Sequence, residues 1–174
     1  MSFMELAWKR RSVRNFKPDD VTTEKVVKLI DAARAAPSAG NCQPWHFYAI
    51  KDAEMKERLN SAAGGQDIVK GAPLCIVVCA DLARTAGRYG DRGRNLYCIQ
   101  DTAAAIQNLL LCAVEEGLAA CWCGAFDEQG VAQALELSAD LRPVAIIPVG
   151  YPASDVSPRD RRQIAEICSF IGFE

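Results

Sequence analysis

The 174-residue sequence lacks the features that mark several classes of protein. It contains a single histidine, and its 20 lysines and arginines do not outnumber its 22 aspartates and glutamates, so the formal net charge is −2. A general basic field for nucleic acid or an anionic membrane is therefore not expected. No apolar run approaches the roughly 20 residues that span a bilayer. We expect neither nucleic acid nor a membrane as a partner.

Targeting and nucleotide-binding motifs are also missing. No basic start leads into an apolar stretch at the N-terminus, so we expect no signal peptide and a cytoplasmic location. Neither G-x-G-x-x-G nor G-x-x-x-x-G-K-[ST] occurs, which argues against Rossmann and P-loop sites. No repeat or low-complexity segment divides the chain. Its length suits a single domain over residues 1–174 with a hydrophobic core.

Cysteine is common, but its spacing does not indicate a metal site. Eight cysteines are present, and no two have the C-x-x-C spacing. The closest pairs, Cys75/Cys79 and Cys121/Cys123, lie in apolar runs typical of strands. We therefore predict buried free thiols, no metal ligands and a reducing compartment.

Hydrophobic periodicity predicts alternating helices and strands. The run Leu74–Ala80 is apolar throughout, as in a strand covered on both faces. Residues 81–95 are polar and rich in glycine and arginine, and we expect a mobile loop there. The expected helices cover residues 3–9, 23–36, 53–63, 96–116 (buried and central) and 128–137. The expected strands cover residues 45–50, 74–80, 119–124 and 144–149.

The C-terminal segment carries apolar residues beyond the expected core: Ile164, Ile167, Phe170, Ile171 and Phe173. Residues of this kind have to be buried somewhere. Two alternatives stay open, an interface with another subunit and a helix folded back on its own subunit.

Three segments carry side chains suited to a flat, phosphorylated ligand. The run R-R-S-V-R at residues 10–14 can grip a phosphate, although such a run can also be a solvated face. Residues 37–47 combine small residues with two prolines, and the amides of Asn41 and Gln43 suit the edge of a heteroaromatic ring. Residues 159–162, R-D-R-R, add a second basic cluster.

Together these motifs resemble those of the nitroreductase family. They are R-R-S-V-R at 10–14, P-S-A-G-N-C-Q-P-W-H-F at 37–47, G-L-A-A-C-W-C-G-A-F at 117–126, and P-V-G-Y-P at 148–152 followed by R-D-R-R. Any one could arise by chance, but all four in this order are specific. The resemblance implies an α+β fold with a central, mainly antiparallel sheet flanked by helices. It also implies an intertwined homodimer in which each C-terminal segment reaches across the other subunit.

The resemblance further implies FMN as the cofactor. The arginines near both ends of the chain would hold it, with Arg159 and Arg161 at the phosphate and Arg162 as an alternative to either. The loop at 37–43 would border the ring of the FMN held mainly by the partner subunit. The cofactor-binding residues implied are Arg10, Arg11, Ser12, Arg14, Pro37, Ser38, Ala39, Asn41, Gln43, Gln66, Gly124, Ala125, Arg159 and Arg161.

No catalytic side chain is expected, because FMN itself carries the redox chemistry while the protein orients and tunes it. The resemblance implies ping-pong hydride transfer from NADH or NADPH, through FMN, to a nitroaromatic, a quinone or a related acceptor. A flavin-binding or storage protein without efficient turnover, and a flavin-fragmenting or dehalogenating relative, remain alternatives. The preferred nicotinamide stays open, as does whether the arginines of residues 81–95 receive a nicotinamide phosphate or only face water.

Overall fold

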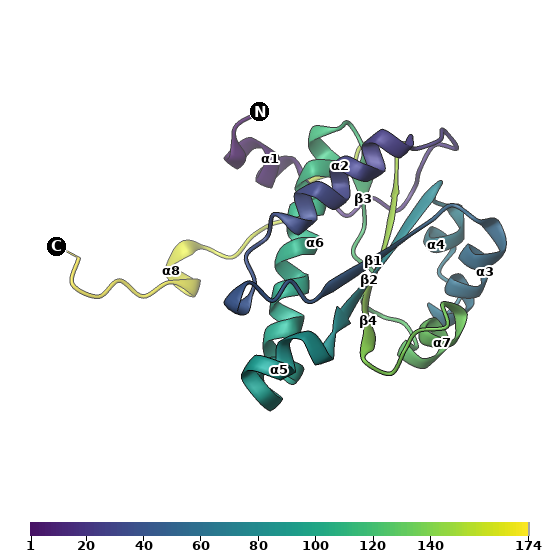
Figure 1. Ribbon diagram of the computed structural model, residues 1–174. Helices are drawn as coiled ribbons and strands as arrows, with labels where there is room; N and C mark the ends of the chain where they lie inside the picture. The colour runs from purple at the N-terminus through teal and green to yellow at the C-terminus, as the bar shows by residue number, and fades with distance from the viewer. Residues whose placement is uncertain (174) are drawn as a thin grey trace.

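The computed structural model describes residues 1–173 and contains a four-stranded sheet with helices on both faces (Figure 1). The strands lie in the order β1-β2-β4-β3, and each neighbouring pair is antiparallel. Their bounds are β1 (Trp45–Ile50), β2 (Leu74–Asp81), β3 (Ala119–Ala120) and β4 (Leu141–Gly150). The predicted α+β class with an antiparallel sheet is confirmed.

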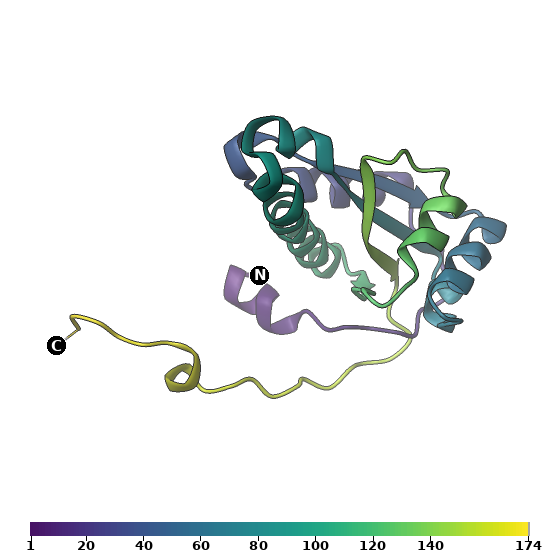
Figure 2. The same ribbon diagram turned by 90° about the horizontal axis from the view of Figure 1, so that it is seen from below.

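Two groups of helices cover the sheet (Figure 2). One face carries α2 (Thr23–Arg34) and α6 (Cys98–Glu115), and the other carries α3 (Ala53–Ala62), α4 (Asp67–Gly71) and α7 (Glu128–Ala134). The remaining helices are α1 (Phe3–Lys9), η1 (Ala39–Asn41), α5 (Leu82–Arg92), η2 (Gly93–Tyr97) and α8 (Ile164–Ile167). None of the helices in residues 1–173 combines the length and the apolarity needed to cross a bilayer.

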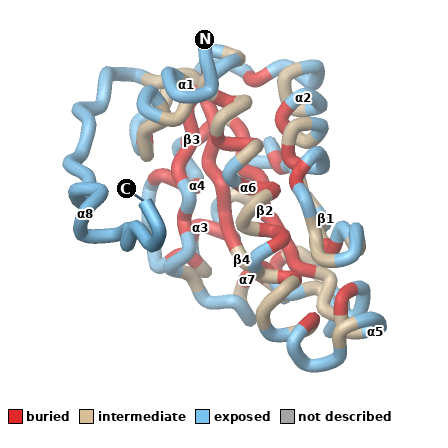
Figure 3. Tube along the Cα trace, turned by 90° about the vertical axis from the view of Figure 1, so that its left-hand side faces the viewer, coloured by how far each residue is buried: buried red, intermediate tan, exposed pale blue. Residues whose placement is uncertain are grey.

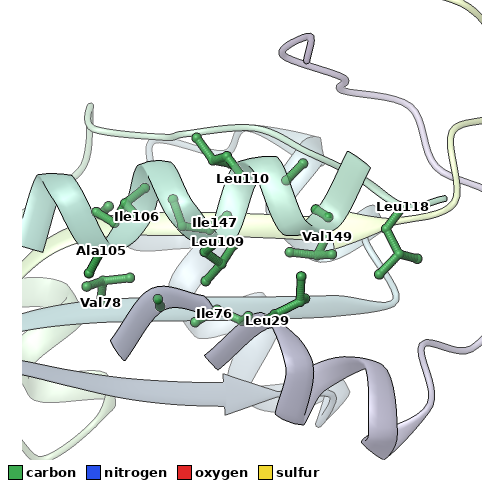
Figure 4. Close-up of a cluster of buried hydrophobic side chains, with 14 of the residues drawn as sticks. Leu29, Ile76, Val78, Ala105, Ile106, Leu109, Leu110, Leu118, Ile147 and Val149 are labelled. Atoms are coloured by element: carbon green, nitrogen blue, oxygen red, sulfur yellow. The ribbon is translucent and has the colours of Figure 1, made fainter. Parts of the chain in front are cut away.

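Strand β2 forms the middle of the core, because successive side chains of a strand point to opposite faces. Leu74, Ile76 and Val78 pack toward α2 and α6, where they meet residues such as Leu29 and Leu109 (Figure 4). Cys75, Val77 and Cys79 pack toward α3, α4 and α7. All six are at most 1% exposed. The predicted strand covered on both faces is confirmed.

Several predicted element bounds are confirmed and others are corrected. Helix α1 covers residues 3–9 as predicted, and Ser2 and Glu5 form the capping box that begins it. The strand predicted at 119–124 pairs with β4 only at Ala119–Ala120 and at one further bridge, Cys123 to Ile146. Strand β4 is longer than predicted because its pairing with β2 begins at Leu141.

The prediction of a mobile loop at residues 81–95 is wrong, because this segment is helical. The Asp81 carboxylate accepts the N–H of Arg84 at 3.1 Å and caps the start of α5. Gly90 interrupts the helix with a φ of 55° and a ψ of −140°, which only glycine adopts without strain. At Gly93 a Cβ would lie 2.5 Å from the carbonyl oxygen of Thr85. These glycines permit a tight helical turn.

The C-terminal segment leaves the body of the chain and does not return to it (Figure 2). Every residue from 153 to 173 is exposed, and α1 also buries none of its residues (Figure 3). The five large apolar side chains of α8 and the residues after it are between 63% and 87% exposed. The alternative in which this segment folds back on its own subunit is therefore wrong.

Candidate functional site

Residues 10–16 form an extended segment that is fixed to the edge of the sheet. Ser12 forms a parallel bridge with Ala120, and the Val13 N–H donates to the Ala120 carbonyl at 3.2 Å. Val13 is buried, at 6% exposure, and Arg14 beside it is exposed. This backbone pairing gives the predicted phosphate-binding run a rigid support.

The charged groups of this segment have few partners within the chain. Among residues 1–173, neither Arg10 nor Arg14 forms an ion pair. Arg11 donates to the carbonyls of Trp8 and Arg10, but its Nε is buried without an acceptor in the described chain. A buried donor of this kind is costly unless it meets an acceptor. The segment is thus equipped to receive an anion.

Three further predicted site residues lie near Arg14 in the fold: Gln66, Gly124 and Ala125. Gln66 Nε2 donates to the Ala125 carbonyl at 3.2 Å, and Gly124 directly precedes that residue. Arg14 and Gln66 both line a hollow of about 440 Å³. The structure therefore brings together four predicted site residues that come from three separate parts of the sequence.

The field of these arginines also reaches two thiols. The pKa of Cys121 is lowered to about 7, first by hydrogen bonding with Cys123 and then by the positive charges of Arg14 and Arg10. The same contact, together with burial, raises the pKa of Cys123. The arginines therefore add a smaller effect to the contact between the two thiols, which is the main cause of both shifts.

The prediction of buried thiols holds for most of the eight cysteines. Cys75, Cys79, Cys98, Cys121 and Cys123 are buried and free. Burial raises the pKa of both Cys75 and Cys79 to about 12, so these thiols are inert. Cys42 and Cys112 are only partly buried and Cys168 is exposed, so the prediction is wrong for these three.

The loop at residues 37–43 has an unusual backbone. Gly40, Asn41 and Gln43 have φ values of 54°, 56° and 51°, in the left-handed region that costs energy for residues other than glycine. Within the loop, Ser38 Oγ accepts the N–H of Gln43 at 2.9 Å, and Gln43 Nε2 donates to Asn41 Oδ1 at 3.2 Å. A conformation of this kind persists only when its surroundings hold it.

Helix α5 holds the loop from one side. Arg88 Nη1 donates to the Gly40 carbonyl at 3.1 Å, and Arg84 Nε donates to the Cys42 carbonyl at 2.7 Å. A Cβ at Gly40 would lie 2.5 Å from the Tyr89 hydroxyl, so the helix lies directly on the loop. Residues 84–89 were not among the predicted site residues, because the segment was interpreted as a mobile loop.

Asp101, on α6, holds the same loop from the core side. Its Oδ1 accepts the N–H of Ala39 at 3.0 Å, while its Oδ2 is buried without a partner among the described residues. The side chain is 7% exposed, and burial raises the pKa of its carboxyl. Sequence reasoning missed Asp101, although an acidic residue in an otherwise apolar helix was a usable signal.

The predicted site residues fall into three groups that do not lie together within one chain. The 37–43 loop contacts α5 and α6, whereas Gln66 begins α4 on the other face of the sheet. Arg159 and Arg161 lie in the exposed C-terminal segment, where Arg161 donates to the carbonyls of Arg159 and Asp160 at 3.2 and 3.1 Å. Arg162 pairs with Glu166 at 3.4 Å.

Known proteins share this fold and sequence pattern. The profile of the family described as the nitroreductase family matches residues 7–66 and 59–151. The crystal structure of a nitroreductase family protein from Clostridium difficile 630 has a TM-score of 0.86 at 33% identity, covering 99% of this chain and 100% of that one. A Methanothermobacter thermautotrophicus protein, named as a candidate NADH dehydrogenase/NAD(P)H nitroreductase, is 33% identical over 92% of this chain and 82% of its own. The FMN reductase (NADPH) of Bacillus subtilis is 27% identical over 87% of this chain and 66% of its own.

Substitution Asp101→Asn tests the buried carboxyl. Asparagine retains an oxygen for the Ala39 N–H and removes the charge. Because the folded pKa of Asp101 is raised, its contribution to stability is full below the ordinary aspartate pKa of about 4 and is lost as pH rises through the folded value. The variant should therefore gain stability, relative to the unaltered protein, as pH rises. Urea unfolding at several pH values measures this, with Asp91→Asn as an exposed control; a pH-independent difference would contradict it.

Proposed function

The chain belongs to the nitroreductase family, and on that premise we propose that it is an FMN-dependent oxidoreductase that uses NADH or NADPH as electron donor. The observation that carries the proposal is Arg14, which forms no ion pair among residues 1–173 and lines a hollow with Gln66, on a segment that also carries Arg10. Relatives named as NAD(P)H nitroreductases and FMN reductases support the same cofactor and donor. The acceptor would be a nitroaromatic, a quinone or a related compound.

The donors present in the structure suit FMN. Its phosphate is a dianion and needs fixed positive charge, which Arg10 and Arg14 would supply, whereas Arg11 lines a different hollow from Arg14. The pyrimidine edge of a flavin ring presents both oxygens and an N–H group. The amide of Gln66 offers a donor and an acceptor for it, and Ser12 adds a hydroxyl.

When bound, FMN would supply hydride transfer from NAD(P)H to the acceptor. The protein itself would bind the flavin, orient it and tune its reduction potential. Arg14 carries a positive charge beside the hollow that it shares with Gln66, so we expect it to favour the reduced, anionic ring. A tenfold preference of this kind corresponds to about 30 mV for a two-electron couple. Gly124 and Ala125 would offer backbone groups to the ring.

The active protein would be a homodimer. Helix α1 exposes Phe3, Met4 and Trp8 at 57–68%, and the C-terminal segment exposes its apolar side chains alongside Arg159 and Arg161. Exposed apolar surface of this extent is typical of an interface. A second copy would bury it and bring the second arginine cluster and the 37–43 loop to a site on the first. We also expect a cytoplasmic location, where the free thiols would stay reduced.

Rapid mixing tests the activity directly. The FMN-loaded protein should lose its flavin absorbance within seconds of mixing with NADH or NADPH, because the bound ring accepts electrons from the donor. Addition of a quinone should then restore the absorbance. Stopped-flow spectroscopy measures both phases. Absence of reduction on this timescale with either donor would favour a flavin-binding or storage protein instead.

The double substitution Arg10→Gln with Arg161→Gln tests the cofactor site. Each charge-assisted hydrogen bond to the phosphate is expected to contribute tenfold or more, so FMN affinity should fall by about 100-fold. Quenching of FMN fluorescence on titration measures the affinity. Arg58→Gln, on the outer side of α3, removes a guanidinium far from these groups and serves as the control. Equal affinity in the double variant and the control would refute the assignment.

The double substitution Ile167→Asp with Phe170→Asp tests the dimer. Two carboxylates in an apolar interface are costly, so the variant should be monomeric and should bind FMN weakly. Light scattering after size exclusion gives the mass, and FMN titration gives the affinity. Ser61→Asp with Gln129→Asp adds the same charge at exposed positions of α3 and α7. A monomer that keeps full FMN affinity would contradict the proposal.

A further inference from the structure

Helix α5 carries a row of arginines without acidic partners. Arg84 and Arg88 are four residues apart and lie along one side of the helix, and Arg92 follows the kink at Gly90. Among residues 1–173, none of the three forms an ion pair. Like charges at this spacing destabilise a helix. The stability of α5 therefore does not explain the row.

The guanidinium groups of Arg84 and Arg88 are held in fixed positions with donors to spare. Each donates one N–H to a carbonyl of the 37–43 loop, at 2.7 Å for Arg84 and 3.1 Å for Arg88. A guanidinium has five N–H donors, so most remain available. Arg88 also lies over the ring of Tyr89, with its Cζ 5.4 Å from the ring centroid.

Arg92 lies beyond the kink at Gly90 and joins the row through Tyr97, whose ring packs edge-on against Tyr89 with the centroids 5.2 Å apart. Its Nε donates to the Tyr97 hydroxyl at 2.9 Å, and its Cζ lies 5.3 Å from the centroid of the same ring. Ordering a long side chain before a ligand arrives lowers the entropy that binding has to overcome. The row is therefore a prearranged set of forked donors, suited to phosphate groups.

The row lies beside the loop that would border the flavin ring. Gly40 allows this contact, because a Cβ there would lie 2.6 Å from Arg88 Nη1. A nicotinamide that reaches the flavin has to bring its own phosphates along, several ångströms from the ring. A cationic row next to the loop can receive them.

We propose that Arg84, Arg88 and Arg92 bind the phosphate groups of the nicotinamide dinucleotide donor. This inference rests on the proposed function and adds a donor subsite to it. The shared chemistry is a phosphate, which is either the pyrophosphate of both donors or the 2′-phosphate of NADPH alone. The row of arginines determines the affinity for NADH or NADPH and does not change the rate of hydride transfer.

The variants Arg88→Gln and Arg92→Gln, alone and together, test the row. For the donor that uses it, KM should rise about tenfold with each substitution while kcat stays the same, because a phosphate contact is equal in the ground and transition states. Arg88→Lys should restore affinity only in part, since lysine keeps the charge and loses the fork. Arg58→Gln is the matched control.

The pattern of change identifies the phosphate. A rise in KM for NADPH only assigns the 2′-phosphate, and a rise for both donors assigns the pyrophosphate; either result supports the row. A double variant with the KM values of the control overturns it. A double variant that loses FMN affinity with unchanged KM also overturns it, because the arginines would then only support the 37–43 loop.

A binding measurement separates this inference from the proposed function. Calorimetric titration with adenosine 2′,5′-bisphosphate and with ADP reports phosphate binding without any redox step. Binding of either compound that weakens about tenfold or more in the double variant supports the row. Equal binding of both compounds by variant and control refutes it. If the unaltered protein is not reduced by NADH or NADPH, the proposed function fails while the calorimetry still decides on the row.

Discussion

Positive charge that the chain does not neutralise is the constraint on which the site depends. Arg10 and Arg14 project from a segment whose backbone is fixed to β3, and Arg11 buries a donor without an acceptor among the described residues. A protein gains nothing from such an arrangement unless an anion completes it. The sheet edge makes the charge rigid, and rigidity is what a cofactor site requires.

The second part of the site depends on backbone strain that is held from two directions. The 37–43 loop has three residues in the left-handed region, and it persists because Asp101 accepts from one end while α5 donates to its carbonyls. Asp101 lies on α6, the buried central helix, so a helix of the hydrophobic core holds the strained 37–43 loop in place. The hydrophobic core thereby determines where the loop lies.

The sequence predicts those parts of the fold that local patterns specify. The apolar run of β2, the capping box of α1 and the apolar surface of α6 each follow from neighbouring residues, and all were recovered. Helix α5 was missed because Gly87, Gly90 and Gly93 are typical of loops. The contacts that hold it against the 37–43 loop, from Arg84 and Arg88 to carbonyls 42 and 48 residues away in sequence, have no local signature. Asp101 did have a local signal, as an acidic residue among the apolar residues of α6, but its partner, the Ala39 N–H, lies 62 residues away in sequence.

The arrangement of the three site groups argues that the functional unit is larger than one chain. The site residues form three groups, which are Arg10–Arg14 with Gln66, the 37–43 loop, and Arg159 with Arg161. Within one chain these groups lie apart. The segment that carries the last group is also the one with the most exposed apolar side chains. Burial of that segment on a second copy would move its arginines along with it. The same hydrophobic effect that removes the apolar surface from water would then assemble the charges around the cofactor phosphate.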